Sequence, residues 1–489
     1  MQSAASHPST VAPVQPSTPW RRTLDDLPGP SGWPLVGNLL QIDVTRAHKT
    51  FARWADESGP LYHVRLGKRH LLVLADPGLV NEALHDRPGR FQRPQIMRDA
   101  LLDLDINGVF AAEGTDWRRQ RKLAMHALNP DHLRKYATRL GAVAERLRQR
   151  WQRAADRDER VDAPGDLKRF TVDVTSGLAF GTDLNTLERE GDAIQRHLGA
   201  VFPVLAKRIF APFAYWRWLR LPSDRAVDRA MREVLVLVND LVRSARLRRT
   251  EQAESGTGPN DFLEAMVRAQ SEDTAFSDAE IVGNVLTMLL AGEDTTANTI
   301  AWVMHLMAEY PEIQARMQVE VDSVLGDALT PADHEVTEAL SYVEAVAHET
   351  MRVLPVAPLQ ALEATSDTVI GDIKVPKGTE LYLLAGYMAS RPEHFAEPDA
   401  FKPERWLVTP HHAREGHNSH AFVPFGGGPR FCPGRHLAML EIKMVLAMLC
   451  RNFEVSRWPG TPPPEEVFSF TMMPSDFFVR LRPRQGPTH

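Results

Sequence analysis

The residue types best suited to chemistry in this sequence lie around Cys432, in the segment 424–449. Three glycines at 426–428 precede this cysteine, and glycine lets a backbone approach another group closely. Pro433 and a strongly helical apolar stretch follow, so Cys432 is expected just before a helix N-terminus, where free N–H groups and the helix dipole lower a thiol pKa. Arg430 adds a positive charge two residues earlier. The pattern predicts a site that holds a thiolate, with an ordinary buried cysteine as the alternative.

A second unusual group of polar residues lies inside an apolar helix that is predicted to run from Ser277 to Tyr310. Ser277 and Glu280 form a capping box at its start, and Pro311 ends the helical pattern. Its middle contains poor interior helix formers, namely Gly292, Asp294, Thr295, Thr296 and Thr299. Apolar turns flank this group on both sides, which is typical of a helix that bends around a ligand. A solvent-exposed polar stripe is the alternative.

The elements that must position these residues are mostly helical. Strand-like runs within 62–77 predict a hairpin, and residues 115–355 show the spacing of three and four residues that is typical of helices. From about residue 363 the chain changes to short strands, with pairs expected around Gly371 and Gly378. The segment 468–483 predicts a last hairpin with its tip at Pro474. No linker separates these parts, so the sequence predicts one large, mainly α domain with a minor β part.

This domain is expected to span residues 27–489. Residues 1–26 are rich in Ser, Thr, Ala and Pro and are predicted to form a disordered tail. The tail lacks the apolar core of a secretory signal, and its prolines exclude the amphipathic helix of an organelle transit peptide. No run of about 18 apolar residues is present, so we expect a soluble, cytoplasmic protein without a membrane anchor.

Composition and motif content exclude several function classes. The chain has 57 basic and 63 acidic residues and a net charge of -6, so no basic excess points to nucleic acid. Its two cysteines, Cys432 and Cys450, are expected on one helical stretch about 27 Å apart, which excludes a disulfide between them. The sequence also lacks HExxH, P-loop and GxSxG patterns, so the zinc, nucleotide and serine chemistries that these motifs mark are set aside.

Four motifs of the chain resemble those of one family. The loop FGGGPRFCPG, at 425–434, fits the pattern F-x-x-G-x-R-x-C-x-G of the haem-binding loop of the cytochromes P-450, which are haem-thiolate monooxygenases. AGEDTT at 291–296 resembles their oxygen-activation motif, and WRRQR at 117–121 resembles their propionate-binding helix. ETMR at 349–352, followed by PERW at 403–406, is similar to their E-x-x-R motif. The resemblance covers the chain from about Leu27 onward and implies the cytochrome P-450 fold, with a long central helix over the haem.

The resemblance implies that the matching residues bind haem b. Cys432 would be the axial ligand of the iron, and Phe425 would pack beside its sulfur. The other implied cofactor-binding residues are Trp117, Arg121 and Arg430 at the haem propionates, Ala291 and Gly292 where the helix passes over the haem, and Gly434 in the loop. One position departs from the family, because Leu362 stands where many members carry an Arg or His that touches a propionate.

Two residues of the central helix are implied in catalysis. Asp294 and Thr295 would deliver protons to bound oxygen, the acid and the alcohol working through water. The Thr295 hydroxyl is expected to face that oxygen rather than the preceding helical turn. On the cysteine side of the haem, Glu349 and Arg352 are expected to form an ion pair that Arg405 completes, with a structural role.

The resemblance also places a substrate pocket. Its expected lining is mostly apolar and comprises residues around Phe110, Leu290, Ala291, 356–360, Met472 and Met473. This lining predicts a hydrophobic or amphipathic organic substrate. The aromatic segment 209–222 is interpreted as a lid over the substrate entrance, with contact to a membrane surface as the alternative.

The predicted function is insertion of one oxygen atom from dioxygen into the substrate. The chain shows no reductase domain, so electrons are expected from a separate ferredoxin, flavodoxin or reductase. The predicted docking patch consists of Arg118, Arg119, Lys122, Arg435 and Lys443, with solvated charge as the alternative. A peroxide-using enzyme and a non-catalytic haem-binding protein are the competing functions. The pair Asp294–Thr295 argues against both, because peroxide-using members typically lack it and a carrier has no use for proton delivery.

Overall fold

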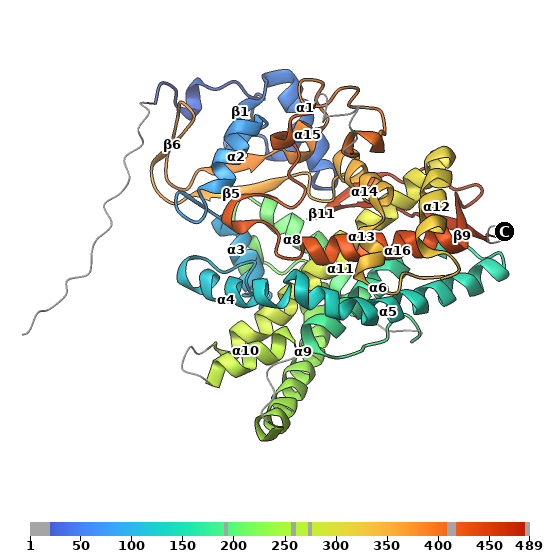
Figure 1. Ribbon diagram of the computed structural model, residues 1–489. Helices are drawn as coiled ribbons and strands as arrows, with labels where there is room; N and C mark the ends of the chain where they lie inside the picture. Colours follow the sequence, from blue (N-terminus) through green and yellow to red (C-terminus); the bar gives the residue numbers. More distant parts are fainter. Residues whose placement is uncertain (1–19, 190–193, 256–260, 272–275, 408–416, 485–489) are drawn as a thin grey trace, which may run out of the picture.

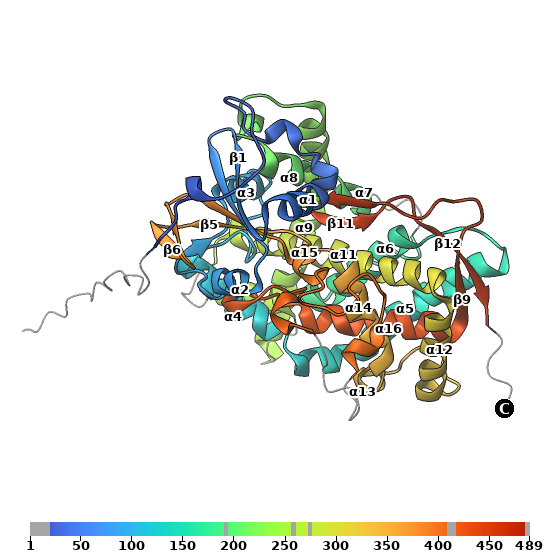
Figure 2. The ribbon, with the colours of Figure 1, turned by 90° about the horizontal axis from the view of Figure 1, so that it is seen from above.

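The structure is a computed structural model that describes residues 20–189, 194–255, 261–271, 276–407 and 417–484 (Figure 1). Strands β1, β5 and β6 lie on one side of the molecule and β9 on the opposite side, and helices make up the bulk of the rest (Figure 1). The long helix α11 (Asp278–Glu309) lies in the middle of both views (Figure 2). The mainly α architecture with a minor β part is therefore confirmed.

Helices account for most of the described chain between residues 114 and 353, as the sequence predicted. The remaining α-helices are α1 (Ala47–Ser58), α2 (Pro77–His85), α3 (Gln95–Leu102), α4 (Gly114–Ala127), α5 (Pro130–Asp156), α6 (Ala163–Phe180), α7 (Ile194–Gly199), α8 (Val201–Phe210), α9 (Pro222–Ser255), α10 (Phe262–Ser271), α12 (Pro311–Leu325), α13 (His334–Glu338), α14 (Ser341–Val353), α15 (Ala385–Ala389) and α16 (Arg435–Asn452). Prolines stand in the first turns of α5, α6 and α12, where a missing N–H breaks no helical hydrogen bond.

Within the described residues, the strands form one sheet of five strands and three smaller sheets. Their bounds are β1 (Leu61–Leu66), β2 (Arg69–Leu74), β3 (Phe91–Gln92), β4 (Val161–Asp162), β5 (Gln360–Ala364), β6 (Thr368–Ile370), β7 (Ile373–Val375), β8 (Glu380–Leu383), β9 (Phe453–Arg457), β10 (Glu466–Ser469), β11 (Thr471–Pro474) and β12 (Phe478–Pro483). The largest sheet has the order β1-β2-β8-β5-β3, in which β2 and β8 are parallel and the other neighbours antiparallel.

Two of the predicted hairpins are confirmed, and two strand pairings are wrong. β1 pairs with β2, and β6 pairs with β7 across Gly371, as expected. The strand after Gly378, β8, pairs with β2 and β5 and not with β7. The last predicted hairpin turns at Phe470 rather than at Pro474, because β10 pairs with β11 and β12 pairs with β9 and β4. Pro474 instead ends β11.

Helix α11 has the bounds that its capping signals predict. The Ser277 hydroxyl accepts from the Glu280 amide, and the Glu280 carboxylate accepts from the Ser277 amide, so the capping box is formed. The first half of α11 shares one buried cluster with α8, α9 and α10 through residues such as Leu286, and its second half shares another with α5, α14 and α16 through residues such as Ile300. The polar group therefore lies between two parts of the core.

Part of the segment predicted as a tail packs against the domain. Residues 1–19 lie outside the described residues. Arg22 forms a bridge with Ile373 of β7 and an ion pair of 2.7 Å with Asp372, and Leu24 is buried in the cluster around the sheet. The packed chain therefore begins before residue 27. Within the described ranges, we find no helix that combines the length and the apolar content that a bilayer crossing needs.

Candidate active site

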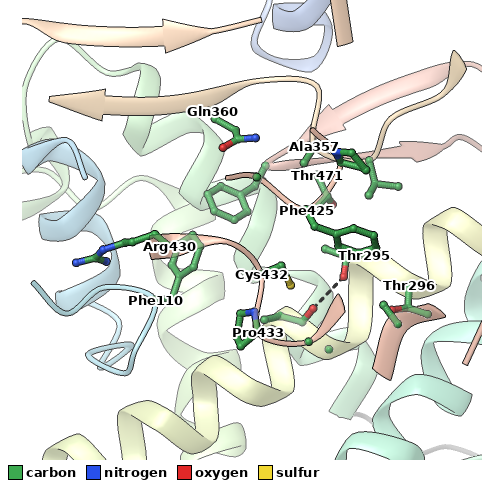
Figure 3. Close-up of a pocket in the computed structure, with 18 of the residues that line it drawn as sticks. Phe110, Thr295, Thr296, Ala357, Gln360, Phe425, Arg430, Cys432, Pro433 and Thr471 are labelled. Atoms are coloured by element: carbon green, nitrogen blue, oxygen red, sulfur yellow. Dashed lines mark hydrogen bonds between the residues drawn. The ribbon is translucent and has the colours of Figure 1, made fainter. Parts of the chain in front are cut away.

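A cavity of about 410 Å³ lies between α11 and the loop that carries Cys432 (Figure 3). The residues that line it come from α4, α6, α8, α11 and α16, from β5 and from the β10–β11 hairpin. Most of the lining is apolar, as the predicted pocket required. The Cys432 sulfur and the Thr295 hydroxyl both open onto this space (Figure 3). Motifs separated by about 140 residues in the sequence thus meet in one cavity.

The Cys432 loop is held rigidly on the cavity wall. The Cys432 amide donates to the Phe425 carbonyl at 2.8 Å, and Phe425 and Gly434 also line the cavity. Helix α16 begins at Arg435 with Gly434 as its N-cap, so Cys432 lies just before the helix, as predicted. The expected lowering of the thiol pKa is wrong, because burial raises this pKa more than the Gly434 amide, Arg121 and Arg435 lower it. A metal ion at the sulfur would reverse this balance, since a coordinated thiol is deprotonated.

The glycines before Cys432 make room for neighbouring backbone. Gly426 and Gly428 have φ values of 69° and 62°, a region that other residues rarely adopt. A Cβ on Gly428 would lie 2.2 Å from the Leu84 carbonyl oxygen at the end of α2. At Gly428 the loop backbone therefore packs closely against α2, so the loop lies between α2 and the cavity.

Three residues predicted to bind the propionates meet on one wall of the cavity. Trp117 and Arg121 lie one turn apart on α4, and both line the cavity with Arg430. The Arg430 guanidinium stacks over the Trp117 ring at 4.4 Å, and its Nη2 donates to the Ala112 carbonyl at 2.9 Å. The Arg121 Nη2 donates to the Phe431 carbonyl at 2.7 Å. Burial lowers the pKa of both arginines below its ordinary value.

The Arg430 guanidinium is incompletely paired. Its Nη2 also contacts the Glu113 carboxylate, whereas its Nε and Nη1 are buried without a hydrogen-bond partner among the described residues. Buried donors of this kind are costly unless an acceptor reaches them. The wall is therefore suited to bind carboxylates that enter the cavity.

Sequence reasoning missed two further arginines, Arg87 and Arg93, on the same wall. They lie between α2 and α3, and the segment DRPGRFQRP at 86–94 gave no sign that both would turn inward. The Arg93 guanidinium lies 3.4 Å from the centroid of the Phe110 ring. Only the folding of 87–93 against the Cys432 loop brings them together, so no local pattern could have identified them.

The distal wall is the polar part of α11. Ala291, Gly292 and Thr295 line the cavity, as do Thr296 and Thr299. The Thr295 hydroxyl donates to the Ala291 carbonyl at 3.0 Å, so the expectation that it avoids the preceding turn is wrong. A Cβ on Gly292 would lie 2.4 Å from Thr175 Oγ1 of α6. The absence of a side chain at Gly292 thus serves the packing of α6 on α11 rather than clearance over the cavity.

Asp294 does not line the cavity. Its side chain is buried, and its Oδ1 forms an ion pair of 2.6 Å with Lys168 Nζ of α6. Its Oδ2 accepts a hydrogen bond from the Thr471 hydroxyl of β11. Thr471 itself lines the cavity, so its hydroxyl lies between the carboxylate and the open space. The predicted acid and alcohol are therefore adjacent in sequence but face different neighbours.

A second carboxyl group, Glu441 of α16, does line the cavity and was missed by the sequence reasoning. Burial raises its pKa well above the ordinary value, against a hydrogen bond with Thr296 that lowers it. Burial of this kind favours the neutral, proton-holding form of a carboxyl group over the charged form. Its signal in the sequence was a lone Glu inside the apolar helix after Cys432.

The substrate end of the cavity differs in part from the prediction. Phe110 and residues Val356, Ala357, Leu359 and Gln360 line it as expected. Leu290 packs into the core beside the cavity, and Met472 and Met473 are absent from the lining. Phe468, Phe470 and Thr471 take their place because the hairpin turns four residues earlier than predicted. The Phe470 ring stacks on Phe202 at 5.6 Å.

Comparison with known proteins identifies the family. The sequence pattern of the cytochrome P-450 family matches residues 27–481. The mitochondrial 25-hydroxyvitamin D-1 alpha hydroxylase of Homo sapiens is 31% identical over 467 residues, which cover 91% of this chain and 89% of that protein. This chain belongs to the cytochrome P-450 family. It is an oxidoreductase of the monooxygenase type, with haem b as its cofactor.

Other P-450 relatives come from different compartments and kingdoms. The chloroplastic protein Lutein deficient 5 of Arabidopsis thaliana is 26% identical over 419 residues, covering 83% of this chain and 69% of that protein. The cyclooctat-9-en-7-ol 5-monooxygenase of Streptomyces melanosporofaciens is 28% identical over 456 residues, covering 92% and 94%. Because chloroplastic and mitochondrial proteins are among these relatives, the cytoplasmic location stays a prediction.

The cavity of this P-450 fits haem. Cys432 offers a sulfur at one face of the space, and the buried, unpaired donors of Arg430 are suited to a propionate. When bound, haem supplies the iron at which dioxygen is activated. Trp117, Arg121 and Arg430 would hold its carboxylates, and Phe425 would cover the sulfur. Leu362 also lines the cavity but has no donor, so the departure from the family pattern persists in the structure.

The predicted ion pair behind the loop is present in this P-450. Arg352 binds both carboxylate oxygens of Glu349 at 2.8 and 3.0 Å, and Arg405 Nε donates to Glu349 Oε1 at 3.0 Å. The Trp406 indole N–H adds a hydrogen bond of 2.8 Å to the same carboxylate. Glu349 and Arg352 are completely buried and lie away from the open space, which agrees with a structural role.

Proposed function

We propose that this P-450 inserts one oxygen atom from dioxygen into a hydrophobic organic substrate. The observation that carries the proposal is the position of Cys432 and Thr295 in one apolar cavity (Figure 3). One oxygen atom enters a bond of the substrate, and the other leaves as water after uptake of two electrons and two protons. The chain must therefore supply protons and admit electrons.

Proton delivery is assigned to Thr295, with Asp294 behind it. The Thr295 hydroxyl stands at the cavity wall, where it can hand a proton to an oxygen bound in the space. Asp294 is buried between Lys168 and Thr471, and the Thr471 hydroxyl reaches both this carboxylate and the cavity. We therefore include Thr471 as the positioning residue that connects Asp294 to the open space.

The test of the proposal is the ratio of product formed to reductant consumed. Thr295→Ala leaves Cys432, the arginine wall and the apolar lining unchanged, so haem content and substrate affinity should be nearly those of the wild type. The variant should still consume reductant but release peroxide in place of product. Equal coupling in both proteins contradicts the assignment of Thr295. Product formation with peroxide alone, at the rate reached with a redox partner, would favour the peroxide-using alternative.

The substrate is proposed to be apolar and to contact Phe470. The cavity is apolar at its far end, and the names of two relatives state that they act on 25-hydroxyvitamin D and on cyclooctat-9-en-7-ol. A spectral binding screen over steroids, terpenes, fatty acids and aromatic compounds identifies the class. Phe470→Ala should weaken the best ligand about tenfold by loss of buried aromatic area, whereas Met473→Ala, outside the lining, should not. An equal loss of ligand affinity in the Phe470→Ala and Met473→Ala variants would place the substrate pocket elsewhere.

Electrons are proposed to come from a separate acidic redox protein that docks near Cys432. Arg118 and Lys122 on α4 and Arg435 on α16 are exposed. Two members of the predicted patch are engaged elsewhere, because Arg119 pairs with Glu280 and Lys443 is buried between Glu338 and Glu344.

A charge-reversal experiment tests the smaller patch. The double variant Arg118→Glu and Lys122→Glu should slow reduction by the redox partner and weaken its dependence on salt. Arg243→Glu serves as the control, because Arg243 is exposed and belongs to α9, which contributes no residue to the proposed patch. Reduction rates that are unchanged in the double variant would show that docking uses another surface.

The aromatic segment 209–222 is proposed to cover the substrate entrance. Ile209 and Phe210 line the cavity, and Trp216 is buried with its indole N–H donating to Asp103 at 2.8 Å. Phe213 and Trp218 are exposed by 62% and 89%. Trp216→Phe removes the hydrogen bond to Asp103, the residue that follows α3, and should alter substrate affinity. Unchanged affinity, together with liposome binding that is lost in Phe213→Ser and Trp218→Ser, would favour the membrane alternative.

A further inference from the structure

The wall of the cavity beside the Cys432 loop carries more positive charge than the described protein neutralises. Arg87, Arg93, Arg121 and Arg430 all line it. Glu113 is the carboxylate in contact with this cluster, through the Arg430 guanidinium and the Arg93 amide. The Glu441 carboxyl on α16 also lines the cavity, and burial raises its pKa well above the ordinary value. Glu113 thus offsets one of the four guanidinium charges.

Arg87 is the least satisfied member of the cluster. Only 6% of its surface is exposed, and its Nε and Nη2 are buried without a hydrogen-bond partner among the described residues. Burial, with a smaller repulsion from Arg430, lowers the pKa of Arg87 to about 10, so the group stays charged at pH 7. A buried and unpaired guanidinium destabilises a folded protein unless a ligand pairs with it.

Arg93 stands beside Arg87 and shares its neighbours. Its Nε donates to the Phe110 carbonyl, and its guanidinium lies over the Phe110 ring. Burial, Arg87 and Arg430 all lower its pKa. These contacts fix the orientation of Arg93 but supply no negative charge.

Leu362 of β5 lies on the same cavity without any polar atom in its side chain. Leu84, Phe91 and Leu362 belong to one buried cluster, which places 362 next to the segment that carries Arg87 and Arg93. The segment 87–93 and strand β5 also pair directly, through Phe91 and Ala364. An arginine of the segment 87–93 can therefore take the place of the cation that β5 lacks at position 362.

We propose that Arg87, supported by Arg93, binds the haem carboxylate that lacks a cationic partner at position 362. The two propionates and Glu113 then offset three of the four guanidinium charges, since the Cys432 thiolate offsets the charge of the iron. The proposal goes beyond the three propionate residues that the motifs imply. It also predicts that Arg87 has opposite effects on the two forms of the protein, stabilising the haem-bound form and destabilising the haem-free form.

The experiment measures haem loss and apoprotein stability in Arg87→Leu. Transfer of haem to excess apomyoglobin should be about tenfold faster or more, as expected for loss of a charge-assisted hydrogen bond. The thermal midpoint of the haem-free protein should rise, because an unpaired buried charge is removed. Arg90→Leu is the control, since Arg90 lies three residues away and is already paired with Glu82 and Asp86. It should not accelerate haem loss.

A second measurement keeps the test independent of folding effects. Haem dimethyl ester has no ionised carboxylates, so wild-type apoprotein should bind it more weakly than haem. Arg87→Gln, which keeps a polar amide with N–H donors but not the charge, should narrow this difference and leave affinity for the ester unchanged. In the background of Arg87→Leu, Leu362→Arg should restore slow haem loss by returning a cation to the family position.

Three results would overturn the proposal. Haem loss in Arg87→Leu at the wild-type rate shows that Arg87 does not bind the carboxylate. A fall in the stability of the haem-free protein equal to that of the haem-bound protein assigns Arg87 a purely structural role. An unchanged preference for haem over its dimethyl ester in Arg87→Gln shows that the propionates are held by other residues.

Discussion

Asp294 of α11 and Lys168 of α6 form an ion pair of 2.6 Å on the side of α11 that does not line the cavity. Asp294 raises the pKa of Lys168 against the opposing effect of burial, so the lysine stays charged. The acid and the alcohol of the oxygen-activation motif therefore lie on different sides of α11. Asp294 faces Lys168 of α6, and Thr295 faces the cavity. The Thr471 hydroxyl is the polar group that touches Asp294 and also lines the cavity.

This relationship predicts that Asp294→Asn slows turnover by about 10²–10⁴-fold, the loss typical of a removed proton-transfer group. Haem content and ligand affinity should change little, because Asp294 does not line the cavity. Thr471→Val removes the hydroxyl that connects Asp294 to the cavity and should reproduce much of the loss. Steady-state turnover with saturating redox partner checks both variants. Full activity in Thr471→Val, with a slow Asp294→Asn, would place the proton path on the Lys168 side.

Gly292 gives a prediction about stability that distinguishes packing from chemistry. Gly292→Ala introduces a Cβ 2.4 Å from Thr175 Oγ1 and should lower the free energy of unfolding by about 1–3 kcal/mol through overpacking. Adding Thr175→Ala removes the clash and should restore most of the loss. Denaturant unfolding of the two single variants and the double variant forms the cycle. Additive changes in the free energy of unfolding would show that Gly292 is required for a reason other than its contact with Thr175.

The sequence predicted the parts of this fold that local signals specify. Ser277, Glu280 and Pro311 define the ends of α11 because capping and proline effects act within one helical turn. Cys432 and Thr295 line the same cavity, as expected, because the motifs that contain them are specific to one family. The hairpin turn was misplaced because Phe470 adopts a φ of 71°, which aromatic residues rarely do, and its ring packs on Phe202 from α8.

Other features depend on contacts that no local pattern records. The direction of Asp294 is set by Lys168, 126 positions earlier in the chain, and that of Arg87 by the loop before Cys432. The small size of Gly292 serves a helix contact that appears only when α6 is placed. The pKa of Cys432 is raised because desolvation outweighs the helix start, and desolvation follows from the whole fold.

Glu466 of β10 carries a pH-dependent contact that anchors the hairpin at the cavity. Burial alone would raise its pKa, but hydrogen bonds from His48 and Lys49 of α1 lower it to about 2. The stabilisation is therefore present above about pH 4.5, the ordinary value, and is lost as the pH falls toward 2. Glu466→Gln should cost about 2 kcal/mol at pH 7, after allowance for its partial exposure.

The pH series that checks this contact is urea unfolding of both proteins from pH 7 downward. The difference between wild type and Glu466→Gln should shrink below about pH 4.5, because the unfolded wild-type chain takes up a proton at Glu466 before the folded protein does. A difference that is constant over this range would mean that the hairpin is anchored by its shape and not by the charge of Glu466.

The central claim is that Cys432 provides the thiolate ligand of the haem iron. The most direct measurement is the carbon monoxide difference spectrum of the reduced protein, compared between Cys432→Ser and Cys450→Ser. Cys450 is buried in the core on α16, and burial holds its pKa well above the ordinary range, so it serves as a matched control. The account predicts that the red-shifted band of thiolate-ligated haem is present in wild type and Cys450→Ser and absent in Cys432→Ser. The same band in Cys432→Ser, or its loss in Cys450→Ser alone, would contradict the account.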